Sequence, residues 1–304
     1  MRIIRYIIYS VSIFFLLSCT QGSADSSNAG LSFKSVEGIK FTEVRREFDT
    51  GLAFNDHGFQ QEPNWVLYFL PGDSVKIYSP FEKKYIEYPI YFDHDSVVNF
   101  AREWLRIKTV NNDSLVLQLL QVDDKVISRE RSNVYMRFYS EQYLTKNKGR
   151  ISLKPLTAKD SLFIRQKSDR ANRNPENIDS VFSARIPVQF ESRVKEVQVE
   201  KVKATRYQID QNFTDEYMYP EYNIIIDKAH KDFSYSFSVL VDDKGVMRLG
   251  KMITMVMPEF QESKKRVVEG IIEVYLQRFL KVTPGTTLGM PHTSLIELHV
   301  RGRK

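Results

Sequence analysis

Hydrophobic and polar residues alternate along the chain from residue 31 to residue 145, with the period of two that is typical of β-strands. The densest apolar run, 65–70, ends at a Pro-Gly-Asp turn signal at 71–73, and an Asn-Asn-Asp turn signal at 111–113 separates two further runs. Short strands at this spacing predict a small antiparallel sheet or a partial barrel over residues 31–145. One run, 96–104, stays ambiguous, because its apolar residues also fit one face of a short helix.

The pattern changes after residue 218. We expect a short helical stretch from residue 219, since a proline follows there that suits a first helical turn. Alternation at 233–241 predicts a strand, and a tight turn at 242–245 leads into a second strand, with Gly245 at positive φ. A helix and a last strand at 294–300 complete the order. The expected buried stripe of that helix has the spacing i, i+3, i+4, i+7 and comprises Val267, Val268, Ile271, Val274, Tyr275 and Phe279.

Residues 146–180 are rich in Lys and Arg and poor in apolar residues, and we interpret them as a solvated basic linker with one short helix near 160–166. A patch for nucleic acid or anionic lipid is the sharper alternative. Acids and prolines are scattered through the segment and no helical face collects the charge, which favours the linker. Alternation at 186–190 and 197–199 predicts two strands that lead into a second domain, 181–304.

Composition agrees with a folded, strand-rich protein of about two domains. The chain has 304 residues, of which 42% are hydrophobic, 27% charged and 12% aromatic. The formal net charge of +6 overstates the charge of the folded body, because Arg2 and Arg5 lie in a segment that we expect to be removed. No basic stripe with interleaved aromatic residues occurs, so we do not expect nucleic acid as a partner.

Residues 1–18 have the pattern of an export signal: two arginines, an apolar run at 6–17 and a small residue before Cys19. The apolar run is shorter than the roughly 20 residues that a bilayer-spanning helix needs. The ending Leu-Leu-Ser-Cys at 16–19 resembles the lipobox of bacterial lipoproteins. That resemblance implies that the thiol of Cys19 is diacylated, that the peptide is cleaved before it, and that the new amino terminus anchors the protein to a membrane through its acyl chains.

Cys19 is the only cysteine, which suits an exported protein without disulfides. Residues 19–30 are polar and rich in Ser and Gly, and they predict a flexible tether with a reach of roughly 18 Å. The lipoprotein resemblance implies inner-membrane retention when Asp follows the cysteine; Thr20 stands there, so we expect the outer membrane of a Gram-negative envelope. Only Asp25 offers an acidic residue behind the cysteine, so a periplasm-facing orientation is expected.

The C-terminal order of helix, hairpin, helix and strand resembles the C-terminal domain of TonB-type proteins. The matching segments are Tyr219-Pro220, the strand and turn at 241–245, and the Pro-Gly…Gly-Met-Pro ending at 284–291, within a core of about 218–301. The resemblance implies an αββαβ domain. The expected fold class is therefore α+β and strand-rich, with an N-terminal antiparallel β domain followed by this domain. Phe233, Asn223 and Val282 depart from the family pattern and put the details of its partner surface in doubt.

TonB-type domains bind an extended peptide of an outer-membrane receptor along a sheet edge, by β-augmentation. The resemblance implies such a partner, or another periplasmic peptide, for this chain. The expected uncovered edge belongs to the last strand. The alternatives are that this strand completes its own sheet or that the first domain covers its edge. Its residues are Leu295, Ile296, Glu297, Leu298, His299 and Val300.

The lipobox and the TonB-type resemblance together support the hypothesis of a lipid-anchored, non-enzymatic adaptor. An energy transducer of the TonB type is a weaker alternative, because it would need an uncleaved inner-membrane helix and a long spacer. A structural envelope lipoprotein that packs through its N-terminal β domain is another alternative, and it predicts a contiguous apolar patch there. A third is an enzyme whose site is hidden in that domain, which predicts a polar cleft.

The chain carries few candidates for catalytic or metal-binding groups. Asp93-His94-Asp95 is the only tight cluster of imidazole and carboxylate, and together with Asp56-His57 it could form a metal site, but short Asp-rich turns produce such clusters without a metal. The chain has no Gly-x-Ser-x-Gly elbow, phosphate loop or dinucleotide fingerprint. We therefore predict no catalytic residue, no metal and no cofactor.

Overall fold

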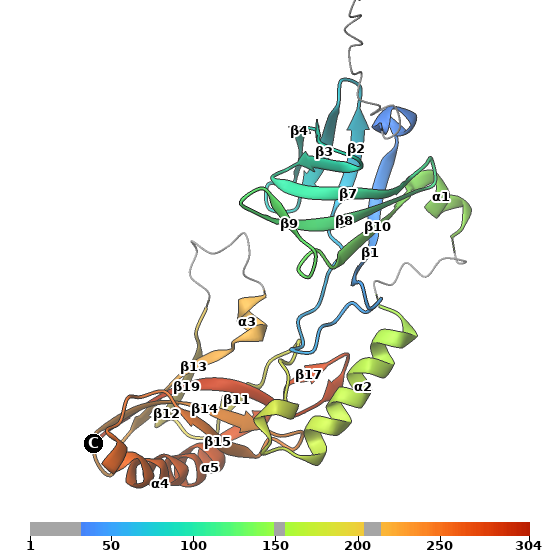
Figure 1. Cartoon of the computed structure of the whole chain (residues 1–304). Coiled ribbons are helices and arrows are strands. Elements are labelled where there is room, and N and C mark those ends of the chain that lie inside the picture. The colour runs from blue at the N-terminus through green and yellow to red at the C-terminus, as the bar shows by residue number, and fades with distance from the viewer. Residues whose placement is uncertain (1–31, 149–155, 204–213) are drawn as a thin grey trace, which may run out of the picture.

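A computed structural model describes residues 32–148, 156–203 and 214–304. The expected signal, Cys19 and the tether lie outside these described residues. Figure 1 shows two β-sheets, the first coloured blue to green and the second yellow to red. None of the helices within the described ranges has the length and apolar content needed to cross a membrane.

The N-terminal sheet is an antiparallel meander that curves nearly into a barrel. After a short 3₁₀ helix, η1 (Phe33–Val36), its strands are β1 (Lys40–Phe48), β2 (Val66–Leu70), β3 (Ser74–Ser79), β4 (Lys84–Pro89), β5 (Tyr91–Phe92), β6 (Val97–Phe100), β7 (Glu103–Val110), β8 (Ser114–Asp123), β9 (Val126–Ser128) and β10 (Val134–Ser140). The order is β4-β3-β2-β1-β10-β8-β7-β6-β5, and β9 pairs with β8. Because only Ile90 separates β4 from β5, the two ends of this order meet and the sheet bends back on itself.

The interior of this sheet is apolar. Strands β1, β3 and β10 bury alternate residues, as period-two patterning predicts. The core includes Phe41, Phe69, Leu105, Leu117 and Phe138, each fully buried. The predicted antiparallel sheet in the N-terminal part of the chain is therefore confirmed.

The ambiguous run at 96–104 forms the β6–β7 hairpin and not a helix. Its two-residue turn consists of Ala101 and Arg102, whose φ angles are 51° and 66°. Positive φ at both central residues is the turn geometry that matches the twist of a hairpin. Neither residue is a glycine, so the sequence carries no signal for this turn.

The C-terminal part is a five-stranded mixed sheet covered by a helix on one face. Its strands are β12 (Val197–Lys201), β13 (Glu221–Asp227), β14 (Phe233–Val241), β15 (Met247–Met252) and β19 (Ser294–Arg303), in the order β12-β13-β19-β14-β15. Two small pairs accompany it, β11 (Gln189–Ser192) with β16 (Leu280–Thr283) and β17 (Thr286–Thr287) with β18 (Met290–Pro291). The helical segments are α3 (Asp215–Met218), η4 (Pro258–Phe260), α4 (Gln261–Ile271), the π-helical η5 (Ile272–Leu276) and α5 (Gln277–Phe279).

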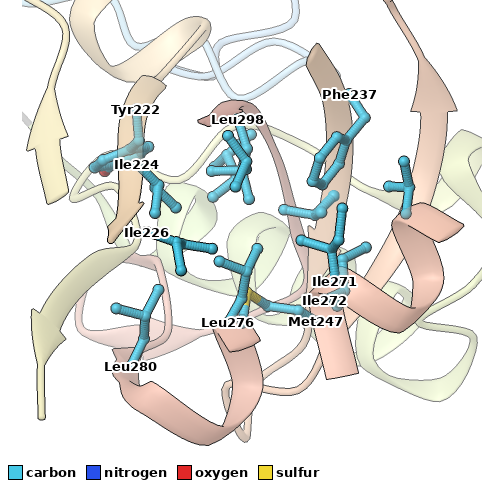
Figure 2. Packing of buried hydrophobic residues seen from close by; sticks show 14 of the residues in the cluster. Tyr222, Ile224, Ile226, Phe237, Met247, Ile271, Ile272, Leu276, Leu280 and Leu298 are labelled. Carbon is cyan, nitrogen blue, oxygen red and sulfur yellow. The ribbon is translucent and has the colours of Figure 1, made fainter. Parts of the chain in front are cut away.

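The expected helix from residue 219 is wrong, because α3 ends at Met218 and the strand β13 follows. Tyr222, Ile224 and Ile226 alternate with exposed or half-buried residues and are buried on the helix-covered face. Figure 2 shows these three side chains pointing into the same apolar cluster as Leu276. Period-two burial therefore decided the local structure, and the proline at 220 precedes a strand.

The helix over the sheet begins near Pro258, as predicted, but part of its expected buried stripe is wrong. Val268 and Ile271 are buried, whereas Val267 and Val274 are exposed. Ile272 and Leu276, four and eight residues after Val268, enter the core instead (Figure 2). The buried stripe therefore runs along 268, 271, 272 and 276, and the last part of it forms the π turn η5.

The segment expected to be a solvated linker is largely ordered. After α1 (Glu141–Lys146), helix α2 (Ala158–Arg173) is much longer than the short helix predicted near 160–166. It starts with a capping box in which Thr157 and Asp160 bond to each other's backbone N–H. Its buried side packs into a small apolar cluster of Ala53, Phe54, Ile164, Ala171 and Phe182. The basic residues occupy the other faces of the helix.

Candidate functional site

The last strand, β19, is paired on both sides. It is antiparallel to β14, with Leu240 opposite Leu295, and parallel to β13, with Glu221 opposite Glu297 and Asp227 opposite Arg303. The expectation of an uncovered last-strand edge is therefore wrong. The chain's own strand β13 covers the edge from Glu297 onward, including Leu298, His299 and Val300.

The physical reason lies in the side chains that β13 contributes to the core. Burial of Tyr222, Ile224 and Ile226 stabilises the sheet by roughly 2 kcal/mol each. A peptide that replaced β13 would have to compensate for the exposure of all three. His299 has local partners, with Nδ1 2.8 Å from Ser236 Oγ and Nε2 3.6 Å from Glu221 Oε2. The structure therefore gives this part of the predicted site a structural role.

Leu295 and Ile296 precede the first residue pair with β13. Together with Glu297 they line a pocket of about 220 Å³, whose other walls are Tyr219, Pro220 and the segment around Phe182. The backbone N–H of Glu297 donates to the carbonyl of Pro220, which closes the pocket at the β13 end. Only a short piece of the predicted edge therefore remains accessible.

β15 is one of the two edge strands of the C-terminal sheet, and β12 is the other. β15 ends the strand order, and among the described strands it pairs with β14 alone. Asp242 N–H donates to the carbonyl of Val246, so this pair is hydrogen-bonded and the residues alternate from there. Leu249 then belongs to a non-hydrogen-bonded pair opposite Val239, and its N–H and C=O face away from β14. These groups are unpaired by β14, and a register shift between Leu249 and Met252 bends the edge directly after them.

A groove of about 600 Å³ lies between β15 and the covering helix. Its apolar surface is provided by Leu240, Val246, Met247, Leu249 and Ile272. Its polar walls are Glu176, Arg248, Lys265, Glu269, Glu273 and Gln277. We call this feature, the open side of β15 together with these residues, the β15 groove.

The turn that precedes β15, at one end of the β15 groove, is held in place by polar contacts. Asp242 accepts hydrogen bonds from the N–H groups of Lys244 and Val246 and from Arg248 Nη1, at 2.8–2.9 Å. Burial acts to raise the pKa of the Asp242 carboxyl, but these hydrogen bonds outweigh it and lower the pKa overall. Gly245 has φ of +81°, as predicted for this turn. The strand edge therefore starts from a fixed turn.

Gln277 closes one end of the open edge. Its side-chain oxygen accepts from the N–H of Met247 at 2.9 Å, and its nitrogen donates to the carbonyl of Gly245 at 3.2 Å. Arg248 also lies 3.5 Å from Glu176, which brings the segment after α2 to the groove. A strand added here would therefore begin at Leu249.

Polar contacts at α2 connect the two sheets. Asp160 has no exposed side-chain surface, and its carboxylate lies 3.0 Å from Arg45 Nη1 and accepts the N–H of Ala53 at 2.7 Å. Burial acts to raise the pKa of the Asp160 carboxyl, but hydrogen bonds from Arg45, Ala53 and Thr157 lower it below its usual value. The Thr-x-x-Asp spacing at 157–160 was the available capping signal in the sequence. Nothing in the sequence pointed to Arg45 as its partner.

His292 is a second buried group that the sequence did not single out. Its ring stacks on Phe182 at a centroid distance of 3.8 Å, and Nε2 lies 3.0 Å from the Thr287 hydroxyl. Burial lowers the pKa of His292 to about 4. The imidazole is therefore neutral at neutral pH and belongs to the packing between β18 and the segment after α2.

The two clusters weighed as metal sites are found in turns or at a pocket wall. His94 Nδ1 lies 3.1 Å from Asp93 Oδ2 on the surface, and Asp95 has φ of +52° in the turn before β6. His57 lines the pocket beside Leu295. Within the described ranges, no group of three or more His, Cys, Asp or Glu side chains is arranged to hold a metal ion.

No protein-family model matches the chain, and no curated protein matches it either. What the structure itself establishes is a strand-rich α+β fold with a large antiparallel N-terminal sheet. The site with the clearest binding geometry is the β15 groove.

Proposed function

We propose that the chain is a lipid-anchored, non-enzymatic adaptor of the cell envelope that captures an extended peptide by β-augmentation in the β15 groove. The observation that carries this proposal is the open edge at Leu249, which runs beside a groove with apolar and charged walls. An incoming strand would satisfy the outward N–H and C=O groups with main-chain hydrogen bonds. Catalysis is not required for this role.

The groove also defines the chemistry of the peptide. In an added strand, alternate side chains point to the same face, so every second residue would lie over Met247, Leu249 and Ile272 and should be apolar. Glu269 and Glu273, one helical turn apart, line the far wall and favour a basic residue at its end. Lys265 lies one turn earlier and favours an acidic residue there, which would set the direction of the strand.

The TonB-type resemblance supports this proposal in part. The strands at 233–241 and 247–252, the helix after them and the last strand follow the element order that the resemblance implies. The partner edge differs, because β13 occupies the outer side of β19. We therefore propose a segment of an outer-membrane receptor or another periplasmic peptide as the ligand, bound at β15 and held passively, without energy transduction.

The lipobox motif at 16–19 supports anchoring through Cys19, in the outer membrane and facing the periplasm. Replacing Cys19 with Ala should abolish metabolic labelling by radioactive fatty acid and release the protein from the membrane fraction. Labelling or membrane retention of the Cys19→Ala chain equal to that of the parent would contradict the anchor. Ser18→Ala, which keeps a small residue before the cysteine, is the matched control and should remain labelled.

Capture at β15 can be tested by crosslinking in the intact envelope. A photo-crosslinking amino acid at Lys251, which is exposed beside the open edge, should yield a defined adduct of the lipidated chain. Leu249→Pro should remove that adduct, because proline lacks the outward N–H and is tolerated at a strand edge. Leu249→Val, which keeps the N–H, should retain it. A Lys251 adduct unaffected by Leu249→Pro, or none at all, would argue against capture at this edge.

The structural alternative has one observation in its favour. Phe81 and Tyr85 are exposed at the β3–β4 hairpin, and Tyr91 and Phe92 are exposed on β5. Exposed aromatic residues of this kind fit a packing surface for an envelope partner. A crosslinker at Phe81 that traps the same partner as one at Lys251 would favour this structural role over peptide capture.

A further inference from the structure

One end of the C-terminal sheet carries a cluster of exposed apolar side chains on the loop between β15 and α4. Met255 is 97% exposed and Met257 is 66% exposed, and Ile253 and Phe260 are exposed as well. We call these four residues the apolar tip. Single exposed apolar residues are common on protein surfaces, but several on one short loop mark an interaction surface.

The strand pairing places this tip at the end of the sheet where β14 begins and β15 and β19 end. Met252 pairs with Phe237, and the N–H groups of Ile253 and Thr254 both donate to the carbonyl of Ser236. On the other side of β14, Phe233 lies opposite Gly302. Figure 1 shows the C-terminus at this end of the second sheet, away from the first sheet.

Basic side chains are concentrated at the same end. They come from the segments before β12 and after β13, from the last residues of β19 and from the first turns of α4, where Lys264 Nζ lies 3.4 Å from the Tyr235 hydroxyl. These residues form the basic end: Lys195, Lys228, Lys231, Lys264, Arg266, Arg301, Arg303 and Lys304.

Acidic residues at this end do not cancel the charge. Those nearby are Glu196, Asp227, Asp232, Glu259 and Glu262, fewer than the basic residues. Two of them have local partners, since Glu196 lies 3.4 Å from Lys228 Nζ and Asp232 accepts the N–H of Lys304 at 2.8 Å. The surface around the apolar tip therefore has a net positive charge.

We propose that this end docks on the surface of a bilayer that contains anionic phospholipid. The apolar tip enters the boundary between headgroups and acyl chains, and the surrounding Lys and Arg side chains lie against lipid phosphates. The long methylene chains of Lys and Arg allow their charges to stay at the headgroups while the tip goes deeper.

The shape and the charge of this surface indicate which kind of partner binds it. Met255 is almost wholly exposed and therefore has few protein neighbours, whereas the energetic centre of a protein interface usually combines anchor residues with a well-packed pocket. A bilayer accepts a protruding apolar side chain without a matching pocket. Single-stranded nucleic acid would need several stacking aromatic rings, and the tip has only Phe260. Positive charge around an apolar projection matches an anionic membrane.

This docking does not depend on the β15 groove or on acylation of Cys19. It adds to them a second membrane contact, on the second sheet, whereas the described chain starts at Ser32 beside the first sheet. A chain held at both points would keep both sheets close to the membrane. Failure of peptide capture would leave the docking unaffected, and the reverse is also true.

The test places a fluorophore at the tip of the full chain. In a Cys19→Ser background, Met255→Cys provides a single thiol for a polarity-sensitive dye such as NBD. We expect a blue shift and a rise in emission with vesicles of phosphatidylcholine and phosphatidylglycerol, and no change with phosphatidylcholine alone. Val126→Cys, at a residue 68% exposed on β9, is the control site and should not respond. Because the readout is local, binding of the leader to vesicles does not mimic it.

A second experiment removes positive charges from the basic end and measures binding to the same vesicles. The double substitution Arg301→Gln and Arg303→Gln should weaken partitioning onto the anionic vesicles about 25-fold, because each lost charge weakens it about five-fold. The control is Lys83→Gln with Lys125→Gln, which removes the same charge from exposed turns of the first sheet and should change little. Equal dye responses at residues 255 and 126, an equal response to neutral vesicles, or equal effects of the two charge pairs would each overturn the proposal. A blue shift without vesicles, from self-association or protein contact, would also overturn it.

Discussion

His292 stacks on Phe182, with the two rings 3.8 Å apart and nearly parallel. Phe182 belongs to the apolar cluster formed by α2 and the loop after β1, while His292 follows β18. This one contact therefore connects the end of the second sheet with the segment that joins the sheets. It also buries an ionisable ring in a position where a charge would be unfavourable.

Stability should decrease as pH falls from about 6.5 to about 4. The pKa of His292 is lowered to about 4 by burial, so the unfolded chain takes up a proton at higher pH than the folded chain does. The stabilising contribution is complete above the unfolded pKa of 6.5 and is lost as pH falls through that window, by about 3 kcal/mol in total. Urea unfolding measured across this range should show the decrease, and His292→Gln should flatten it. A parent profile as flat as that of the variant would contradict the assignment.

Asp160→Ala should reduce the free energy of unfolding by about 3 kcal/mol. The substitution leaves the Arg45 guanidinium and the N–H of Ala53 without their buried acceptor. Asp56→Ala is the control, because its ion pair with Lys167 is on the surface and Asp56 is 83% exposed, which predicts a loss below about 1 kcal/mol. Equal unfolding midpoints in urea for the two variants would show that the buried pair contributes nothing special.

Gly58→Ala should be far more destabilising than Gly72→Ala. Both glycines have positive φ, +89° and +81°, so alanine introduces similar backbone strain of about 1 kcal/mol at each. At Gly58 the new methyl group would also overlap the backbone of Ser183, whereas nothing lies within 4 Å at Gly72. Thermal unfolding of the two variants checks this, and similar melting temperatures would mean that the loop after β1 does not press on Ser183.

Ile224→Ala should cost about 3 kcal/mol, because it leaves a cavity where a fully buried side chain stood. Asn223→Ala, one residue away on the exposed face of β13, should cost less than about 0.5 kcal/mol. Denaturant unfolding measures both changes. If Ile224→Ala proved as mild as Asn223→Ala, β13 would be a detachable cover of β19, and the last strand would again be a candidate edge.

Much of the fold was accessible from the sequence, because period-two burial and turn residues act locally. The strand at 233–241, the positive φ of Gly245 and the antiparallel N-terminal sheet follow from such signals. The β6–β7 turn was not accessible, since Ala101 and Arg102 adopt positive φ only because the flanking strands pair. The exposure of Val267 and Val274 was not accessible either, because these residues fit a helical stripe as well as Val268 and Ile271 do, and only the packing against the sheet decides which stripe is buried.

The candidate site was harder to predict because it depends on which strands become neighbours. The last strand was correctly placed, but its pairing with β13 brings together residues about 76 positions apart, as in Glu221 and Glu297. The helical stretch predicted from residue 219 overlaps the start of β13, and no local pattern shows which strand β13 would pair with. The open edge at β15 follows only from the complete strand order.

The capping box of α2 bears on whether the two halves of the chain can fold as separate fragments. Asp160 starts the helix and, with the same carboxylate, holds Arg45 of the first sheet. A cut anywhere between β10 and α2 would separate the acid from its base and leave each fragment with a charge that has lost its buried counterpart. We therefore expect the two sheets to melt in a single cooperative transition, and expression of either half alone to give an aggregation-prone product.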